Sequence, residues 1–489
     1  MRGFLFFISF FLLLFSLESC YKEEVIFNVE ANNFLELPLI LRINNKDCAF
    51  DYSQNTLRYP IEKDSIINFE AFIEFQGYSE VIFNNHSLKN NLINNLGEIR
   101  TNKQYEIKIS TNNTVKVLKL RFTNLPIVQL ITASRIYDEP KSLARFVINF
   151  PNQNTISSYV GIEQRGGWAT LQLPKKSYSF SFLNSTFLDE KTPYSVFDLE
   201  QNTDWVLDGM YTDNTRLRNK IASNIWKAIP GEKHYGTSPN FVELYLNNEH
   251  QGLYCLSENI NAELLLLLNE DALLYKAIGW TGPDCFETSS DDLPSIERWD
   301  GWVQKYPNPN QRINWKPLAD LRNLIVESSD EDFILQIGTF IDIDNFIDYY
   351  LFLNLICAKD NLAKNIFLTK QSLIDRFTII PWDFDNSFGS SGIQPIVNNN
   401  LYKRLSELNP NNFNKRLKDR WIFLRIEAFK ESNLLSIIKK SSNQIQKSNI
   451  IEIENEKWAT IINLETEHAN LMLWIVDRLN TMDNYYQNL

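Results

Sequence analysis

The sequence predicts an α+β protein in which a small all-β region precedes a larger region that begins with strands and ends with helices. Short alternating strands with asparagine-rich turns run from about residue 25 to residue 121. From Leu125-Pro126 the strands become longer, and after Gly389 apolar residues recur at helical spacing to the end of the chain. A chain of 489 residues is too long for one ordinary core, so we expect two or three domains.

The N-terminus has the features of an exported protein. Arg2 and an apolar run over residues 4–17 predict a signal peptide over residues 1–19, because the run is too short to cross a membrane. The sequence Leu17-Glu18-Ser19-Cys20 resembles the lipobox of bacterial lipoproteins, which implies that Cys20 is lipidated. A cysteine that happens to follow a signal peptide is the alternative. The acidic residues after Cys20 resemble a signal for export to the surface of Gram-negative bacteria, so we expect a lipid-anchored protein of the cell envelope, in the outer membrane and exposed at the cell surface.

Charge and composition argue against two classes of function. The formal net charge is −12 and the pI is about 5.1, so there is no surplus of Lys and Arg to neutralise the phosphates of a nucleic acid. The remaining cysteines form no Cys-x-x-Cys pair and the four histidines are scattered, so we do not expect a zinc site.

Residues 20–121 are predicted to form a small sandwich-like β-domain without a catalytic group of residues. We interpret it as a spacer or a binding module between the lipid and the rest of the chain. Four strands are then expected up to about residue 183, followed by a helix over residues 217–229 and a hairpin around Asn247-Asn248. The helical pattern after Gly389 predicts an α-rich second half.

The polar residues that carry most of the chemistry lie around one predicted β-hairpin. Residues 344–357 are apolar on nearly every face, which predicts a buried helix. A polar loop follows over residues 359–364, and then two β-rich runs, residues 365–370 and 376–381, whose short connection predicts antiparallel pairing. A turn centred near Leu373 places Asn365 opposite roughly Pro381. The open end of this hairpin then gathers polar residues from both sides: Asp360, Asn361, Lys364, Asn365, Asp383 and Asp385.

This group predicts a site for a nucleotide and a divalent metal. Crowded carboxylates repel each other unless a cation compensates them, and oxygen ligands with few histidines nearby favour Mg²⁺ or Mn²⁺. The order of helix, Asp-x4-Asn loop, hairpin and Asp is also that of the catalytic half of a protein kinase. By that comparison Asp360 is the catalytic base, and the candidate metal ligands are Asn365, Asp383 and Asp385. Ala358-Lys359 and Asp385-Asn386 differ from the usual kinase residues, which indicates an atypical kinase.

Six motifs, in order along the chain, resemble the spore coat protein H (CotH) kinase family over about residues 125–480. They are RGGWATLQLPKKSYSFSF, DWVLDGMYTDNTRLRNKIA, VELYLNNEHQGLYCLSENI, LYKAIGW, DNLAKNIFL and IPWDFDNSFG. The resemblance implies a two-lobed protein-kinase-like domain over residues 122–489, with an N-lobe over about 122–280 and a C-lobe over about 310–489. It also implies that ATP and Mg²⁺ serve to phosphorylate Ser/Thr hydroxyls of surface or envelope proteins. In this family's pattern, Asp360 matches the catalytic aspartate, and Asn365 and Asp383 match the metal ligands.

Several residues before the hairpin are candidates for contacts to the nucleotide. A kinase needs one strand lysine that pairs with the α and β phosphates, and both Lys176 and Lys276 lie in predicted strands. Arg218, at the start of the predicted helix, is a candidate for a phosphate contact, and Glu258 falls where a kinase hinge presents backbone groups to adenine. The turn Arg165-Gly166-Gly167 would let the backbone approach phosphates, although a plain turn explains it equally well.

Two other functions are compatible with parts of the sequence. An apolar strand that ends in Asp-x-Asp also opens the active site of haloacid dehalogenase-type phosphatases, where Asp383 would be the nucleophile and Asp385 the acid. That fold requires a parallel sheet built from βα units after the motif, and residues 401–489 show helices without strands. The second alternative is a surface binding or attachment protein with a kinase-like fold and no turnover, because a fold alone does not establish a function.

Overall fold

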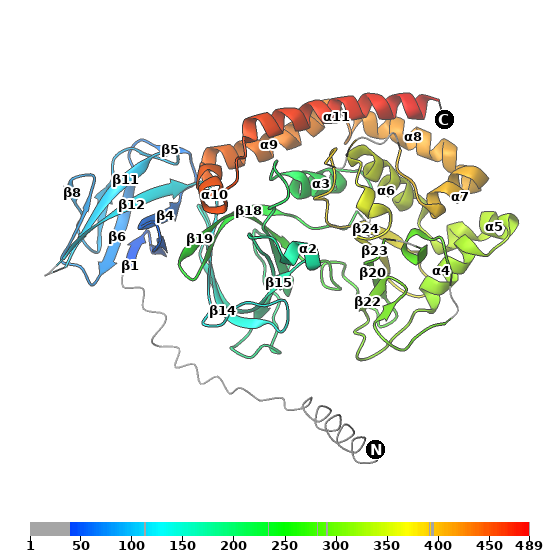
Figure 1. Cartoon of the computed structure of the whole chain (residues 1–489), viewed down its shortest axis with the longest axis horizontal. Coiled ribbons are helices and arrows are strands. Elements are labelled where there is room, and N and C mark those ends of the chain that lie inside the picture. The colour runs from blue at the N-terminus through cyan, green and yellow to red at the C-terminus, as the bar shows by residue number, and fades with distance from the viewer. Residues whose placement is uncertain are drawn as a thin grey trace, which may run out of the picture.

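The computed structural model describes residues 40–488 except residues 112–113, 233, 281, 290–291, 391 and 393–395. The predicted signal peptide and Cys20 lie outside the described residues. Figure 1 shows three parts in a row: an N-terminal β-region, a β-barrel, and a second sheet with helices packed around it. Within the described ranges, no helix is both long enough and apolar enough to cross a membrane.

The N-terminal β-region consists of two sheets that face each other across one apolar core. The sheets have the strand orders β2-β1-β6-β9 and β3-β4-β12-β11-β7-β8, and β5 and β10 form a separate pair. Side chains of β6 alternate between buried and more exposed positions, as expected for a strand with one face on a core. The strands are β1 Ile40–Ile43, β2 Lys46–Asp47, β3 Ala49–Asp51, β4 Thr56–Pro60, β5 Ser65–Ile66, β6 Glu70–Gln76, β7 Glu80–Phe83, β8 His86–Ser87, β9 Leu92–Asn95, β10 Ile99–Arg100, β11 Gln104–Ser110 and β12 Val115–Thr123. The region agrees with the predicted all-β start of the chain.

Buried polar contacts attach this β-region to the barrel. The Arg58 guanidinium of β4 donates to the Glu243 carboxylate of the barrel over 2.6 Å, and both side chains are almost fully buried. The Lys46 ammonium donates to the carbonyls of Phe150 and Gln153 over 2.6 and 2.8 Å. The β-region is therefore attached to the barrel by specific contacts. From the sequence alone, either a spacer or a binding module was expected.

The barrel is a closed sheet with the strand order β13-β14-β15-β16-β17-β19-β18. Parallel pairing between β13 and β18 closes it, and aromatic and aliphatic side chains fill its interior. Its strands are β13 Ile127–Ile131, β14 Ser142–Asn149, β15 Ile156–Arg165, β16 Ser177–Leu183, β17 Asp204–Asp208, β18 Asn240–Leu246 and β19 Glu249–Glu258. The predicted hairpin is β18–β19, and Asn247 and Asn248 form its turn with φ values of 50° and 60°. The sequence predicts the fourth strand over residues 168–182, but its first part is wrong, because α2, Trp168–Leu171, is a single helical turn.

The second sheet has the order β21-β22-β20-β23-β24 and is antiparallel throughout. Its strands are β20 Leu273–Ala277, β21 Arg298–Trp299, β22 Trp302–Tyr306, β23 Ile366–Lys370 and β24 Thr378–Pro381. β20 therefore pairs with the predicted hairpin and not with the barrel. The barrel ends at β19, and β20 belongs to the second sheet.

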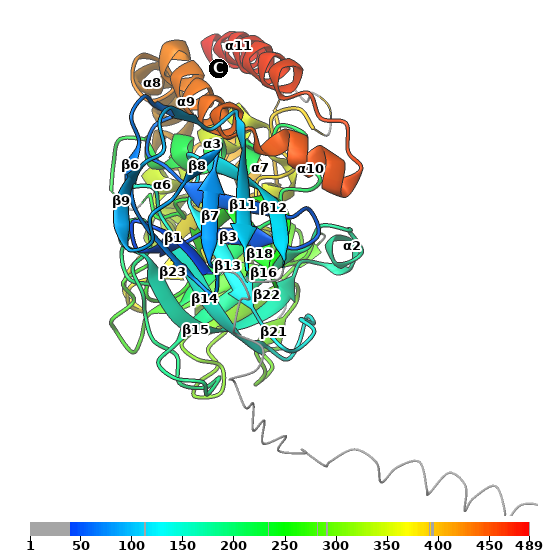
Figure 2. The ribbon, with the colours of Figure 1, turned by 90° about the vertical axis from the view of Figure 1, so that its left-hand side faces the viewer.

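The helices pack against the second sheet and over the barrel. They are α3 Arg218–Lys227, α4 Lys316–Val326, α5 Asp330–Phe340, α6 Ile343–Ile356, α7 Asn400–Leu408, α8 Phe413–Ile426, α9 Glu431–Ser448, α10 Ile450–Trp458 and α11 Leu464–Gln487. As predicted, α6 is buried on nearly every face; the Asp342 side chain caps its N-terminus and Cys357 ends it in a left-handed conformation. Figures 1 and 2 show α9 and α11 side by side above α3 and α6, while α10 packs against β19 of the barrel.

Candidate active site

The open end of the hairpin β23–β24 is the centre of the candidate site. Ile366 pairs with Pro381, one residue away from the predicted register. The Asn365 N–H donates to the Ala277 carbonyl over 3.2 Å, and the Asn365 carbonyl accepts from the Trp382 N–H over 3.0 Å. Asn365 is thus fixed between β20 and the residue that precedes Asp383.

Left-handed backbone marks both sides of this opening. Asn365 and Asp383 each have φ of 62°, a region that residues with a side chain rarely adopt. Such strain persists only where the surroundings enforce it, and it clusters at functional sites. The two predicted metal ligands are therefore held in unusual backbone positions at the same end of one hairpin.

Asn361 fixes the loop that carries Asp360. Its amide donates to the carbonyls of Asn365 and Trp382 over 3.0 and 2.8 Å, and so spans the open end of the hairpin. The hydroxyl of Tyr349, on α6, donates to the Asn361 carbonyl from the other side. Asn361 therefore connects the loop to the hairpin through its side chain and to the buried helix through its backbone carbonyl.

Asp360 lies beside the Asp-Phe-Asp-Asn segment, as the sequence predicted. Its carboxylate is 3.1 Å from the Lys364 ammonium and accepts a hydrogen bond from the Asn386 amide over 3.2 Å. The side chain is half-buried, in a short 3₁₀ turn, Lys359–Leu362. The carboxylate of Asp360 is therefore partly exposed and is oriented by two neighbours.

Four carboxylates lie close enough to the open end of the hairpin for their charges to act on one another. The surrounding protein and the charges of Asp383, Asp208 and Asp360 together raise the pKa of Asp385 to about 7, although part of its surface is exposed to solvent. Burial and Asp208 also raise the pKa of Asp383, against the charges of Arg165, Lys276 and Lys364. Such a group is stabilised by a bound cation.

The oxygen atoms of Asn365 and Asp383 can supply only part of the coordination of a metal ion, so a bound phosphate group and water would have to supply the rest. Within the described ranges no group of three His, Cys, Asp or Glu residues is arranged as a ready-made metal site. The Asp383 carboxylate and the Asn365 amide accept or donate no side-chain hydrogen bond among the described residues, so their oxygens are open to a cation. A hexacoordinate ion such as Mg²⁺ would take its other ligands from phosphate and water.

Of the two candidate lysines, the structure brings Lys276 to the carboxylates. Lys276 lies on β20 opposite Phe367, and its ammonium is 5.6 Å from the centre of that ring. Burial, Arg165 and Lys305 lower its pKa to about 8, whereas Asp383 opposes the shift. Lys176 instead donates to the Leu171 carbonyl over 2.6 Å.

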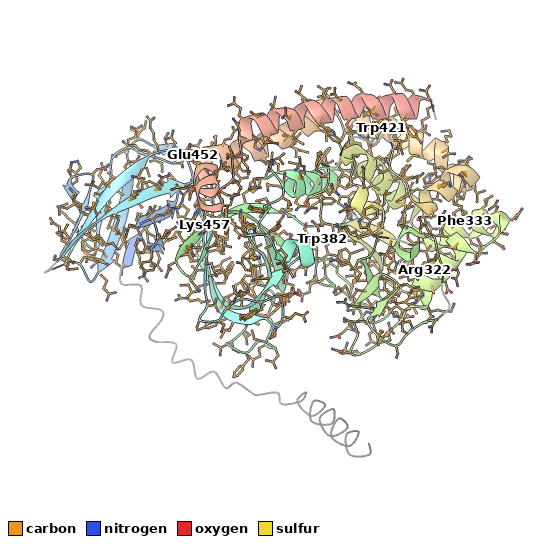
Figure 3. The ribbon with its side chains drawn as sticks, viewed as in Figure 1. Arg322, Phe333, Trp382, Trp421, Glu452 and Lys457 are labelled. Atoms are coloured by element: carbon orange, nitrogen blue, oxygen red, sulfur yellow. The ribbon has the colours of Figure 1, made fainter. Side chains whose placement is uncertain are left out.

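The Arg165-Gly166-Gly167 turn also reaches the cleft. Arg165 ends β15, and its guanidinium lies 5.3 Å from the centre of the Trp382 ring. Gly166 has φ of 129°, and a Cβ there would lie 2.6 Å from Thr170 Cβ, so only glycine fits. Figure 3 shows Trp382 between the barrel and the second sheet, so Arg165 spans the two parts.

The cleft itself is walled by both parts of the molecule. The barrel side and α3 supply most of the lining, and the Asp-Phe-Asp segment closes it. Its wall combines apolar side chains with polar ones: Val206, Met210, Pro239, Cys255, Trp382 and Phe384, and Lys175, Asp208, Asp213, Asn219, Asp383 and Asp385. The apolar side chains of this lining can accommodate a ring, whereas an anionic group can approach its four aspartates only together with a cation.

A hydrogen-bond relay that the sequence analysis missed connects the barrel to the Asp-Phe-Asp segment. The Asn219 amide donates to the Asp208 carboxylate over 2.8 Å, and its oxygen accepts from the Phe384 N–H over 2.6 Å. The buried Phe384 ring packs edge-on against Phe352 of α6, with centres 5.6 Å apart. Both Asp208 and Asn219 lie in a quoted motif, DWVLDGMYTDNTRLRNKIA, but only their pairing across the cleft identifies them.

Arg218 and Glu258 are held away from this cluster. The Arg218 guanidinium pairs with the Asp213 carboxylate over 2.6 Å at the start of α3. The Glu258 carboxylate is buried and accepts from the Ser238 N–H over 2.7 Å. Neither side chain lines the cleft.

The haloacid dehalogenase alternative is wrong, because the aspartate motif follows the antiparallel hairpin β23–β24 and not a parallel strand. None of the curated proteins compared with this chain matches its sequence. The family described as CotH kinase protein matches residues 162–482, which is more than half of the chain and includes every residue of the cluster at the hairpin. The protein therefore belongs to the CotH kinase family.

Proposed function

We propose that the protein is an atypical protein kinase that transfers the γ-phosphate of ATP to Ser/Thr hydroxyls of extracytoplasmic proteins. One observation carries the proposal: Asp360, Asn365 and Asp383 lie around the open end of a single hairpin, in a member of the CotH kinase family. The Asp-x4-Asn spacing and the following aspartate match the roles that phosphoryl transfer requires. The kinase-like arrangement of two lobes is part of this proposal.

In the proposed reaction the substrate hydroxyl oxygen attacks the γ-phosphorus, the bond to the β-phosphate oxygen breaks, and ADP leaves. Asp360 accepts the hydroxyl proton, and its partly exposed carboxylate lies beside the Asp-Phe-Asp segment through the hydrogen bond from Asn386. A divalent cation held by Asn365 and Asp383 supplies charge neutralisation at the phosphates when bound. Lys276 and Arg165 add positive charge next to Asp383.

The source of the phosphate-binding lysine differs from that of an ordinary kinase. In ordinary kinases the lysine lies on an N-lobe strand and pairs with a helix glutamate. Here α3 has the sequence RNKIASNIWK, which contains no carboxylate, and the lysine whose charge lowers the pKa of Asp383 most lies on β20 of the second sheet. We therefore assign the phosphate contact to Lys276.

The location of the protein is a proposal that rests on the sequence. The signal peptide over residues 1–19 and the lipobox around Cys20 place the kinase outside the cytoplasm, attached to a membrane by lipid. Its protein substrates then belong to the envelope or the cell surface.

Metal-dependent nucleotide binding tests the proposal. Residues 21–489 should gain thermal stability from ATP only when Mg²⁺ or Mn²⁺ is present, because a ligand that binds the folded state raises its melting temperature. Asp383→Ala should fold normally and lose this shift. A shift that survives the substitution, or that needs no metal, contradicts the proposed site.

A further inference from the structure

A fully buried ionic cluster joins α10 to the barrel, about seventy residues after the Asp-Phe-Asp segment. The Glu454 carboxylate of α10 accepts from the Lys175 ammonium over 2.8 Å and from the Arg216 guanidinium over 2.7 Å. It also accepts from the Leu253 N–H of β19 over 2.8 Å. The side chains of Glu454, Lys175 and Arg216 have no exposed surface.

The barrel backbone is shaped to admit this carboxylate. Gly252 has φ of 95°, and a Cβ at that position would lie 2.8 Å from Glu454 Oε2. Only glycine therefore lets α10 insert its carboxylate against β19. Lys175 reaches the same strand, since it also donates to the Leu253 carbonyl over 2.5 Å.

Each of the two cations held by Glu454 fixes one wall of the cleft. Lys175 lines the cleft and lies at the end of the segment that begins with Gly166 and Gly167. Arg216 donates to three carbonyls, those of Met210, Tyr211 and Asp213, over 2.5, 3.2 and 2.6 Å. These three residues line the cleft as well.

We propose that Glu454 is a positioning residue for the nucleotide pocket, acting through Lys175 and Arg216. The inference rests on the proposed function. Without its carboxylate, two buried cations would face each other with no anion between them, and both walls would have to move. Glu454 itself lies behind the walls and is not among the residues that line the cleft. The helix α10 thus shapes a cleft that it does not enter.

Steady-state kinetics of Glu454→Gln, with Lys457→Ala as the matched control, tests this role. Lys457 lies on the same helix (Figure 3) and pairs with the partly exposed Glu249 over 2.6 Å. It is not among the described residues that line the cleft. Glu454→Gln should raise the KM for ATP tenfold or more while kcat falls less than threefold, because the residues at the hairpin are untouched. Lys457→Ala should leave both constants unchanged. A Glu454→Gln protein that loses kcat in proportion to its folded fraction, with an unchanged KM, overturns the inference in favour of a purely structural role.

If Glu454→Gln fails to fold, the KM for ATP of Lys175→Met provides a second test of the inference. This variant leaves Glu454 paired with Arg216 in a charge-balanced buried contact, so it should fold. It releases the Gly166–Lys175 wall, and the KM for ATP should rise at least threefold. An unchanged KM contradicts the inference, whereas a wild-type protein that binds no ATP contradicts the proposed function first.

Discussion

Replacement of Asn219 by Ala should show how strongly the barrel controls the Asp-Phe-Asp segment. The substitution removes the hydrogen bond to the Asp208 carboxylate, which is worth about 1.5–3 kcal/mol for a charged partner. It also leaves the Phe384 N–H, on a buried residue, without its acceptor, at a cost of about 1–3 kcal/mol. Because Asp208 is half-buried and water can replace part of the loss, we expect a total destabilisation of about 2–4 kcal/mol.

Chemical denaturation and metal-dependent ATP binding measure the two consequences of Asn219→Ala. The free energy of unfolding should fall by that amount, and the affinity for ATP with metal should fall because Asp383 precedes the released residue. Lys227→Ala is the control, since Lys227 ends the same helix at an exposed position and should change the stability by about 0.5 kcal/mol or less. Full stability together with wild-type ATP affinity in Asn219→Ala would refute the relay.

Three further predictions address charge and location. Lys276→Met should raise the KM for ATP about tenfold without loss of stability, because it removes a buried cation next to Asp383. Lys176→Met should leave the KM for ATP unchanged, because Lys176 is hydrogen-bonded to the Leu171 carbonyl. Equal effects of the two substitutions would contradict the assignment of the phosphate contact to Lys276. With the pKa of Asp385 near 7, a shift from pH 8 to pH 6 should weaken Mg²⁺ binding about tenfold, because a proton then competes with the metal. A metal affinity that does not change with pH would exclude Asp385 as a ligand. In the metal-free protein, Asp385 should lower the free energy of unfolding as the pH rises from about 4 to about 7, because its pKa is higher in the folded state than in the unfolded state. Cys20→Ala should abolish lipid labelling and release the protein from membranes, and unchanged membrane fractionation would refute the anchor.

Local sequence patterns were sufficient to predict the helix and the hairpin that carry the candidate site. The all-round apolar run that became α6 and the two short β-rich runs that became β23 and β24 are contiguous in the sequence, so their mutual placement follows from chain connectivity. The Asp-x4-Asn spacing then places Asp360 and Asn365 at the hairpin's open end. The observed pairing of Ile366 with Pro381 differs by one residue from the predicted pairing of Asn365 with Pro381. The difference is small because the length of the turn fixes the register of a hairpin.

Contacts between distant segments were not predictable in the same way. The closure of the barrel depends on parallel pairing between β13 and β18, which are more than one hundred residues apart. The assignment of Lys276 to the second sheet likewise depends on pairing of β20 with β23. Alternating apolar residues predict a strand, but they do not predict with which other strand it pairs.

Long-range polar contacts were missed for a related reason. Asn219 and Glu454 each lie in an ordinary helical pattern, and neither spacing nor composition distinguishes them from surface residues. Their importance comes from partners in other elements: Asp208 and Phe384 for Asn219, and Lys175 and Arg216 for Glu454. The need for glycine at position 166 could not be predicted either, because it follows from close packing against Thr170.

Phosphate transfer by Asp360→Asn tests the central claim most directly. Residues 21–489 should transfer label from γ-labelled ATP to envelope or surface proteins in the presence of Mg²⁺ or Mn²⁺. As the proposed base, Asp360 acts mainly in the transition state, so Asp360→Asn should lower the turnover by about two to four orders of magnitude while metal-dependent ATP binding persists. Asp383→Ala should lose both transfer and binding. Transfer by Asp360→Asn at the wild-type rate would contradict the catalytic assignment, and a wild-type protein that transfers no phosphate but binds a surface partner as well as both variants do would establish a binding protein instead.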